Sequence, residues 1–186
     1  HLFYPHRVFG VLMAVSAIGL IVSHGFILYE ALAVTAWRTI LVPMLVITSA
    51  FVLGEGLMML FVVFGIAGMN TGFLIMCLIF LLLDLMLWFA YLNLIRNDKD
   101  HVPQANFRRF GPLTISVGLG HILPIMTVIG LFLFPDWKSA SGLSIFTAVA
   151  GLTMIGGGVN QKANIILGAS YLREIVLTSQ GAGMVN

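Results

Sequence analysis

The chain has 186 residues, of which 60% are hydrophobic and only 9% are charged, with a net charge of +2. Because soluble domains usually carry about a quarter charged residues, this composition excludes an ordinary soluble protein and indicates an integral membrane protein. The few basic residues are scattered, so we expect no nucleic-acid partner. Cys77 is the single cysteine, which excludes an internal disulfide and predicts a small buried hydrophobe.

Five apolar segments are long enough to cross a membrane, since a spanning helix needs about 20 residues. They cover residues 8–28, 40–65, 72–94, 113–134 and 143–169. Backbone polar groups in lipid must be paired within the protein, so we predict an all-α, polytopic transmembrane helical bundle that takes up residues 1–186. The chain begins at His1, and we expect it to be part of a longer protein.

Short polar segments separate the predicted spans. GIAGMNTG, residues 65–72, is glycine-rich and predicts a tight turn, whereas residues 96–110 form the one charge-dense stretch. One side of the membrane then carries Arg38, Arg96, Lys99, Arg108, Arg109 and Arg173, and the other carries Arg7 and Lys138. The positive-inside rule places the larger group in the cytoplasm. Trp37, Trp88 and Trp137 are predicted to be anchors at the membrane interface.

Five ionisable side chains fall within the predicted spans, namely His24, Glu55, Asp84, His121 and Lys162. A charged group at the bilayer centre costs roughly 2.5 to 3.5 kcal/mol on insertion scales, so such groups usually face a partner or a cavity. Counting residues along antiparallel helices predicts one buried layer that contains four of them, with Glu55 nearer the outer face. Carboxylates and histidines at staggered depth are typical of a proton path.

Simpler roles remain open for the same residues. Asp84 and Lys162 are compatible with a structural ion pair, and His24 with a bond to the neighbouring backbone. Glu55 lies between Gly54 and Gly56, where another helix can approach closely. His24 and His121, predicted at equal depth, are also compatible with axial ligands of a b-type haem.

Two segments combine small residues with polar ones. GLGHILP, residues 118–124, holds two glycines, a histidine and a proline within a predicted span. The last span contains three consecutive glycines, Gly156 to Gly158, followed by Asn160, Gln161, Lys162 and Asn164. A helix this polar has to face protein, water or a head group rather than lipid.

Four segments resemble the NrfD and polysulfide reductase membrane-subunit family, and they occur in the order found in that family. They are HRVFGVLMAVSAIGLIVSHGF followed by Trp37, LVPMLVITSAFVLGEGLMML, GLGHILPIM with its Gly-x-x-x-Pro pattern, and GGGVNQKANIILGAS. The resemblance covers nearly the whole chain and corresponds to the C-terminal half of the family. Lys162 replaces the usual arginine, Ala169-Ser170 replaces Gly-Gln, and His121 is not typical of the family's proline motif.

The resemblance implies a membrane subunit that exchanges electrons between quinone, menaquinone or ubiquinone, and an iron–sulfur subunit at the membrane surface. It also implies a molybdopterin-type catalytic subunit, surrounding membrane lipids, a bacterial or archaeal cytoplasmic membrane, and no haem in this chain. Quinol oxidation releases protons, for which His24, Glu55, Asp84, His121 and Lys162 are the proton-relay or quinone-binding candidates. His121 suits such a role because histidine changes charge near neutral pH. Two alternatives are a haem-binding anchor and a transporter or structural subunit, since polar helices near the midplane also mark transporters.

Overall fold

The computed structural model describes residues 5–31, 35–97, 115–133 and 141–170. Its elements are α1 (Pro5–Tyr29), the short helix η1 (Thr35–Trp37), α2 (Leu41–Val63), α3 (Thr71–Asn97), the π-helix η2 (Ile115–Ile122), α5 (Leu123–Leu133) and α6 (Ser141–Ser170). No strand occurs in these ranges. The predicted all-α bundle is therefore confirmed, and the helix bounds lie within a few residues of the ranges predicted from hydropathy.

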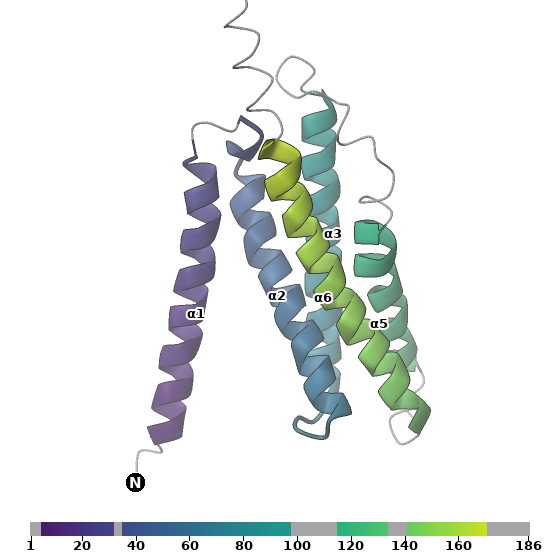
Figure 1. Ribbon diagram of the computed structural model, residues 1–186. Coiled ribbons are helices and arrows are strands. Elements are labelled where there is room, and N and C mark those ends of the chain that lie inside the picture. The colour runs from purple at the N-terminus through teal and green to yellow at the C-terminus, as the bar shows by residue number, and fades with distance from the viewer. Residues whose placement is uncertain (1–4, 32–34, 98–114, 134–140, 171–186) are drawn as a thin grey trace, which may run out of the picture.

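Four stretches of helix are long and apolar enough to cross a membrane: Val8–Tyr29, Leu41–Val63, Thr71–Ile95 and Ile115–Leu133. The last of these combines η2 and α5. Helix α6 is longer than any of them but is diluted by its glycines and polar residues. It nevertheless runs alongside them through the bundle, so a fifth span remains the prediction for α6 (Figure 1).

Helix α6 crosses the bundle between α2 on one side and η2 with α5 on the other, and α3 packs on α2 and α5. Helix α1 stands at the side and packs mainly on α2 (Figure 1). That contact is close near the start of α2, where a Cβ added to Gly25 would lie 3.0 Å from Pro43 Cα. Most of α1 is exposed, as expected for a helix surrounded by lipid.

The turn between α2 and α3 follows from the glycine-rich sequence between them. Gly65 has a φ of 71°, a left-handed conformation that glycine adopts without strain and that ends α2. Asn70 then begins α3, because its side-chain oxygen accepts a hydrogen bond of 2.8 Å from the backbone N–H of Phe73. The tight turn predicted for residues 65–72 is confirmed.

Two glycine pairs allow helix backbones to touch. A Cβ added to Gly56 on α2 would lie 2.9 Å from the carbonyl oxygen of Gly151 on α6. A Cβ added to Gly120 on η2 would lie 2.7 Å from the Cα of Gly157, also on α6. Real Cβ atoms essentially never approach so closely, so both crossings require glycine. The expectation that a helix approaches closely beside Glu55 is thus confirmed.

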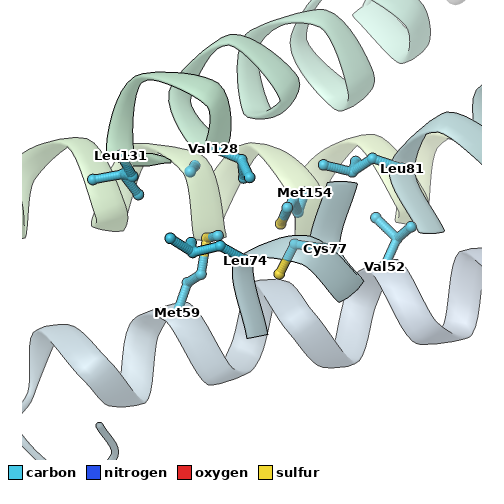
Figure 2. Packing of buried hydrophobic residues seen from close by; sticks show 9 residues of the cluster. Val52, Met59, Leu74, Cys77, Leu81, Val128, Leu131 and Met154 are labelled. Carbon is cyan, nitrogen blue, oxygen red and sulfur yellow. The ribbon is translucent and has the colours of Figure 1, made fainter. Parts of the chain in front are cut away.

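The core divides into two clusters along the bundle. The apolar cluster lies at the end where α2 turns into α3, and comprises Val52, Met59, Leu74, Cys77, Leu81, Val128, Leu131, Ala150 and Met154 (Figure 2). Cys77 is fully buried there, as the sequence predicted. The aromatic cluster lies toward the opposite end and comprises Val42, Leu45, Trp88, Tyr91, Ile95 and Ile165.

The tryptophans do not all anchor the membrane interface as predicted. Trp88 is 1% exposed and stacks on Tyr91, with ring centroids 5.8 Å apart. The prediction was wrong for Trp88 because it occupies the inward face of α3, four residues after the buried Asp84. Trp37 is partly buried and ties η1 to α6, and Trp137 lies outside the described residues.

Replacing Trp37 with phenylalanine tests the attachment of η1 to α6. The indole Nε1–H of Trp37 donates a hydrogen bond of 3.0 Å to the carbonyl oxygen of Ile165. Phenylalanine keeps a six-membered aromatic ring but has no N–H group to donate this bond. We therefore expect the protein to lose about 0.5 to 1.5 kcal/mol of stability. Thermal unfolding of the detergent-solubilised protein measures the change. An unaltered unfolding temperature would show that the bond contributes nothing.

Candidate functional site

The most distinctive polar feature is a buried pair between Asp84 on α3 and His121 on η2. Asp84 Oδ2 lies 2.8 Å from His121 Nε2, and both side chains are 1% exposed. Carboxylates are rarely buried to this extent without a partner, because desolvation of the charge is costly. The pair joins two helices at the centre of the bundle, in the depth range where an ionisable group is most costly.

The π-helix η2 explains how His121 reaches this position. Pro124 has no backbone N–H to donate and its ring crowds the carbonyl of Gly120, one turn earlier, which disfavours a regular α-helix. The chain instead adopts the wider i→i+5 pattern over Ile115–Ile122 and returns to α-helix at Leu123. Such wider turns are frequent at functional sites. The segment GLGHILP therefore contains the wider turn, admits α6 against Gly120 and places His121 beside Asp84 of α3.

The hydrogen bonds of His121 define how many protons the pair holds. His121 Nδ1 lies 2.8 Å from the backbone carbonyl oxygen of Ser116. A carbonyl oxygen can only accept, so Nδ1 carries a hydrogen. The contact between Nε2 and Asp84 then holds one further proton, either on the imidazole ring or on the carboxyl group. The pair consequently shares one proton, and moving it between partners leaves the net charge unchanged.

Thr48 on α2 completes the surroundings of the carboxyl group. Its Oγ1 lies 2.5 Å from Asp84 Oδ1, and also 3.1 Å from the carbonyl oxygen of Met44. The hydroxyl has only one hydrogen to donate. It therefore donates to Asp84 when the carboxyl group is ionised, and to Met44 when Asp84 is itself the donor. Thr48 thus satisfies Asp84 in either protonation state.

Lys162 on α6 is a basic residue from a further element that interacts with Asp84. It is half-buried, and its ammonium group interacts electrostatically with Asp84. The direct ion pair of Asp84 is nevertheless with His121, so the structural Asp84–Lys162 pair kept open above does not form in this arrangement. Lys162 therefore interacts with Asp84 at longer range, without fixing the geometry of the carboxyl group.

Glu55 forms a second buried polar position, away from the first. It lies on α2 and is 9% exposed, and the Cys77 thiol is a hydrogen-bond partner of its carboxyl group. Its Oε2 has no partner among the described residues. Glu55 follows Thr48 by two helical turns on α2, and Cys77 precedes Asp84 by two turns on α3. The two polar positions are therefore about 10 Å apart along the helix axes.

The structure does not place His24 in the buried layer. His24 is exposed on α1, which packs mainly on α2 rather than on η2. Counting residues predicted the depth of His24. It could not predict which face of α1 points into the bundle, or that α1 stands at the side of the bundle. Both ring nitrogens of His121 already have protein partners. The two histidines are thus not arranged as opposing ligands of one haem.

Two contributors were missed from the sequence. Thr48 was overlooked because threonines in membrane helices usually bond to their own backbone, as Thr48 also does. Ser116 contributes a backbone carbonyl, which no side-chain pattern reveals. A signal did exist for Thr48, which stands seven residues before Glu55 and therefore on the same face of α2.

No protein-family model matches the chain, and no curated protein or solved structure is significantly similar to it. Four long apolar helices, and a buried acid–base pair held between three helices, make this chain a multi-pass membrane protein with an ionisable centre.

Proposed function

We propose that the chain is the quinone-interacting membrane subunit of a multisubunit respiratory oxidoreductase in a bacterial or archaeal cytoplasmic membrane. It passes electrons between the quinone pool and an iron–sulfur subunit that works with a molybdopterin-type catalytic subunit. The resemblance of four segments, which occur in the order found in the family, supports the quinone and the partners. The observation that carries the proton chemistry is the buried Asp84–His121 pair.

Oxidation of a quinol to a quinone releases two electrons and two protons. In the proposed function the electrons pass to the iron–sulfur subunit, whereas the protons need acid–base groups inside the membrane. The Asp84–His121 pair can take up one proton beyond the one it shares, which gives a neutral carboxyl group beside an imidazolium ring. A buried group that accepts and releases protons in this way acts as a relay.

The pair does not itself form a quinone pocket in the described arrangement. Asp84 and His121 are each 1% exposed and their hydrogen-bonding groups are engaged, so a quinone ring has no direct access to them. We therefore assign Asp84 and His121 to proton transfer, next to a quinone site that further helices complete. Lys162 and Glu55 are auxiliary groups in the same proposal.

Quinol-driven reduction of the iron–sulfur clusters, followed by EPR in the intact membrane complex, tests the proposal. We expect His121→Gln to slow this reduction by about 10²- to 10⁴-fold, the usual contribution of a general acid–base group. The matched control is His24→Gln, because His24 is exposed on α1 and should tolerate the same change. Chemical reduction of the clusters by dithionite should be unaffected in both variants.

Other outcomes would identify a different function. Purification of the protein from the membrane without any iron–sulfur subunit would favour a transporter or structural subunit. A b-type haem absorption band that disappears in His121→Gln would favour the haem-binding anchor. Equal slowing by both substitutions would remove His121 from the relay.

A further inference from the structure

Buried polar side chains without protein partners are concentrated on one side of the Asp84–His121 pair. They are Ser116 Oγ, Trp88 Nε1, Tyr91 OH, both amide atoms of Gln161, and Asn164 Nδ2, none of which has a hydrogen-bond partner among the described residues. Of these five side chains, which we call the polar layer, all but the half-buried Asn164 are at most 1% exposed. Leaving a buried donor or acceptor unpaired is costly. The concentration of such groups in one region therefore needs an explanation.

The helix directions place the whole polar layer at the same end of the bundle. Trp88 and Tyr91 follow Asp84 by one and two turns on α3, and Ser116 precedes His121 on η2. Gln161 and Asn164 follow Gly157, the residue of α6 that touches Gly120. Helices α3 and α6 end, and η2 begins, at the same end of the bundle (Figure 1).

Packing confirms that these helices meet there. Trp88, Tyr91 and Ile165 belong to the aromatic cluster, and Val117 of η2 packs against it. Gln161 and Asn164 precede Ile165 on α6 by four residues and by one, and Ser116 is next to Val117. This end also carries the exposed Arg38 just before α2, and is the end that the basic residues of the sequence assign to the cytoplasm.

The opposite side of the pair differs in character. Leu81 on α3, Val52 on α2 and Met154 on α6 are each at most 2% exposed and belong to the apolar cluster. Leu81 lies one turn from Asp84, Val52 one turn from Thr48, and Met154 two turns before Gln161, so these side chains separate the pair from Glu55. Beyond them, Glu55 Oε2 and Thr147 Oγ1 are the polar side-chain atoms without described partners.

We infer that ordered water occupies the polar layer and connects the Asp84–His121 pair to the charged end of the bundle, whereas the apolar cluster closes the other side. Buried water typically makes about three hydrogen bonds to polar groups that lack other partners. Ser116, Trp88, Tyr91, Gln161 and Asn164 offer such bonds, with both donors and acceptors among them. The inference rests on the proposed function and deepens it, because it gives the shared proton access from one side only.

Radiolytic labelling of the protein in its native membrane tests the inference. Short X-ray pulses generate hydroxyl radicals from water, and mass spectrometry finds the side chains oxidised next to that water. We expect Trp88 and Tyr91 to be oxidised several-fold faster than Cys77 and Met154. All four are at most 1% exposed, and sulfur side chains react readily with such oxidants. Faster labelling of the two aromatic residues would therefore report water rather than intrinsic reactivity.

A pair of variants sharpens the experiment. Gln161→Leu removes the two amide groups from the polar layer at similar volume, so labelling of Trp88 and Tyr91 should fall several-fold. Met154→Leu changes a residue two turns earlier on the same face of α6 and should leave their labelling as it was.

Three results would overturn the inference: no labelling of Trp88 and Tyr91, equal labelling of all four residues, or unchanged labelling in Gln161→Leu. The measurement uses no quinol. The expected labelling in a protein that fails to oxidise quinol would therefore refute the proposed function and leave the water route standing.

Discussion

Asp84→Asn should abolish most quinol-driven electron transfer while leaving the fold intact. The asparagine amide can donate to His121 Nε2 where Asp84 Oδ2 now lies, and its oxygen can accept from Thr48. Both hydrogen bonds survive, but the amide neither binds nor releases a proton. We expect activity to fall by about 10²- to 10⁴-fold with little change in unfolding temperature. Quinol-driven cluster reduction and thermal unfolding of the same preparation measure the two quantities.

The control for this substitution is Glu30→Gln, which makes the same change from carboxylate to amide at an exposed position. Full activity in Asp84→Asn would exclude Asp84 as a proton carrier.

The structural role of Asp84 is tested separately by Asp84→Leu. This substitution leaves His121 Nε2 without a partner and should cost about 1 to 3 kcal/mol of stability. The double variant Asp84→Leu/His121→Leu should recover stability, since replacing both members of a buried pair with apolar residues is often neutral. It should not recover activity.

Gly157→Ala should have the largest effect on assembly of the bundle. An added methyl group would press on the backbone of Gly120, where α6 and η2 touch. Neither backbone can yield without moving a helix, so we expect a loss of about 1 to 3 kcal/mol in stability. Activity should fall as well, because Gly120 is the residue next to His121. Thermal unfolding and quinol-driven cluster reduction again provide the measurements.

The neighbouring residue supplies a close control for this prediction. Gly156 is exposed, and a Cβ added there meets nothing within 4 Å. Gly156→Ala should therefore keep activity and stabilise the helix by up to about 1 kcal/mol, because alanine favours helix over glycine. If the two alanine variants behave alike, the effect comes from helix propensity and not from contact with η2.

Much of the fold follows from hydropathy alone. Long apolar runs bounded by glycine, proline and charge predict the helices of a membrane protein closely, since lipid leaves few other structures available. The rotation of each helix was harder to predict. Asp84 and His121 were predicted at one depth and do meet, but His24, at a similar predicted depth, faces outward on α1. The depth of a residue in the membrane follows from counting along its helix. The direction in which its side chain points depends instead on packing between helices far apart in the sequence.

The site also contains features that residue types alone do not predict. The π-helix follows from the effect of Pro124 on backbone hydrogen bonding, which a count of apolar residues does not register. Trp88 resembled an interface anchor by type, yet the inward face of α3 buries it. Segments 98–114 and 171–186 contain Lys99, Arg108, Arg109 and Arg173, which lie outside the described residues. The predicted orientation therefore stays a prediction.

The wide turn of η2 makes the length of this segment part of the site. An α-helix turns by about 100° per residue, so one residue more or fewer between Ser116 and Pro124 would swing the position of His121 to another face of the helix. Related chains with the same residue types but one residue fewer here would present a different side chain to the carboxylate of α3. Spacing along this stretch therefore carries information that residue identity does not. A sequence alignment that inserts a gap in this stretch would pair two histidines that lie on different faces of their helices.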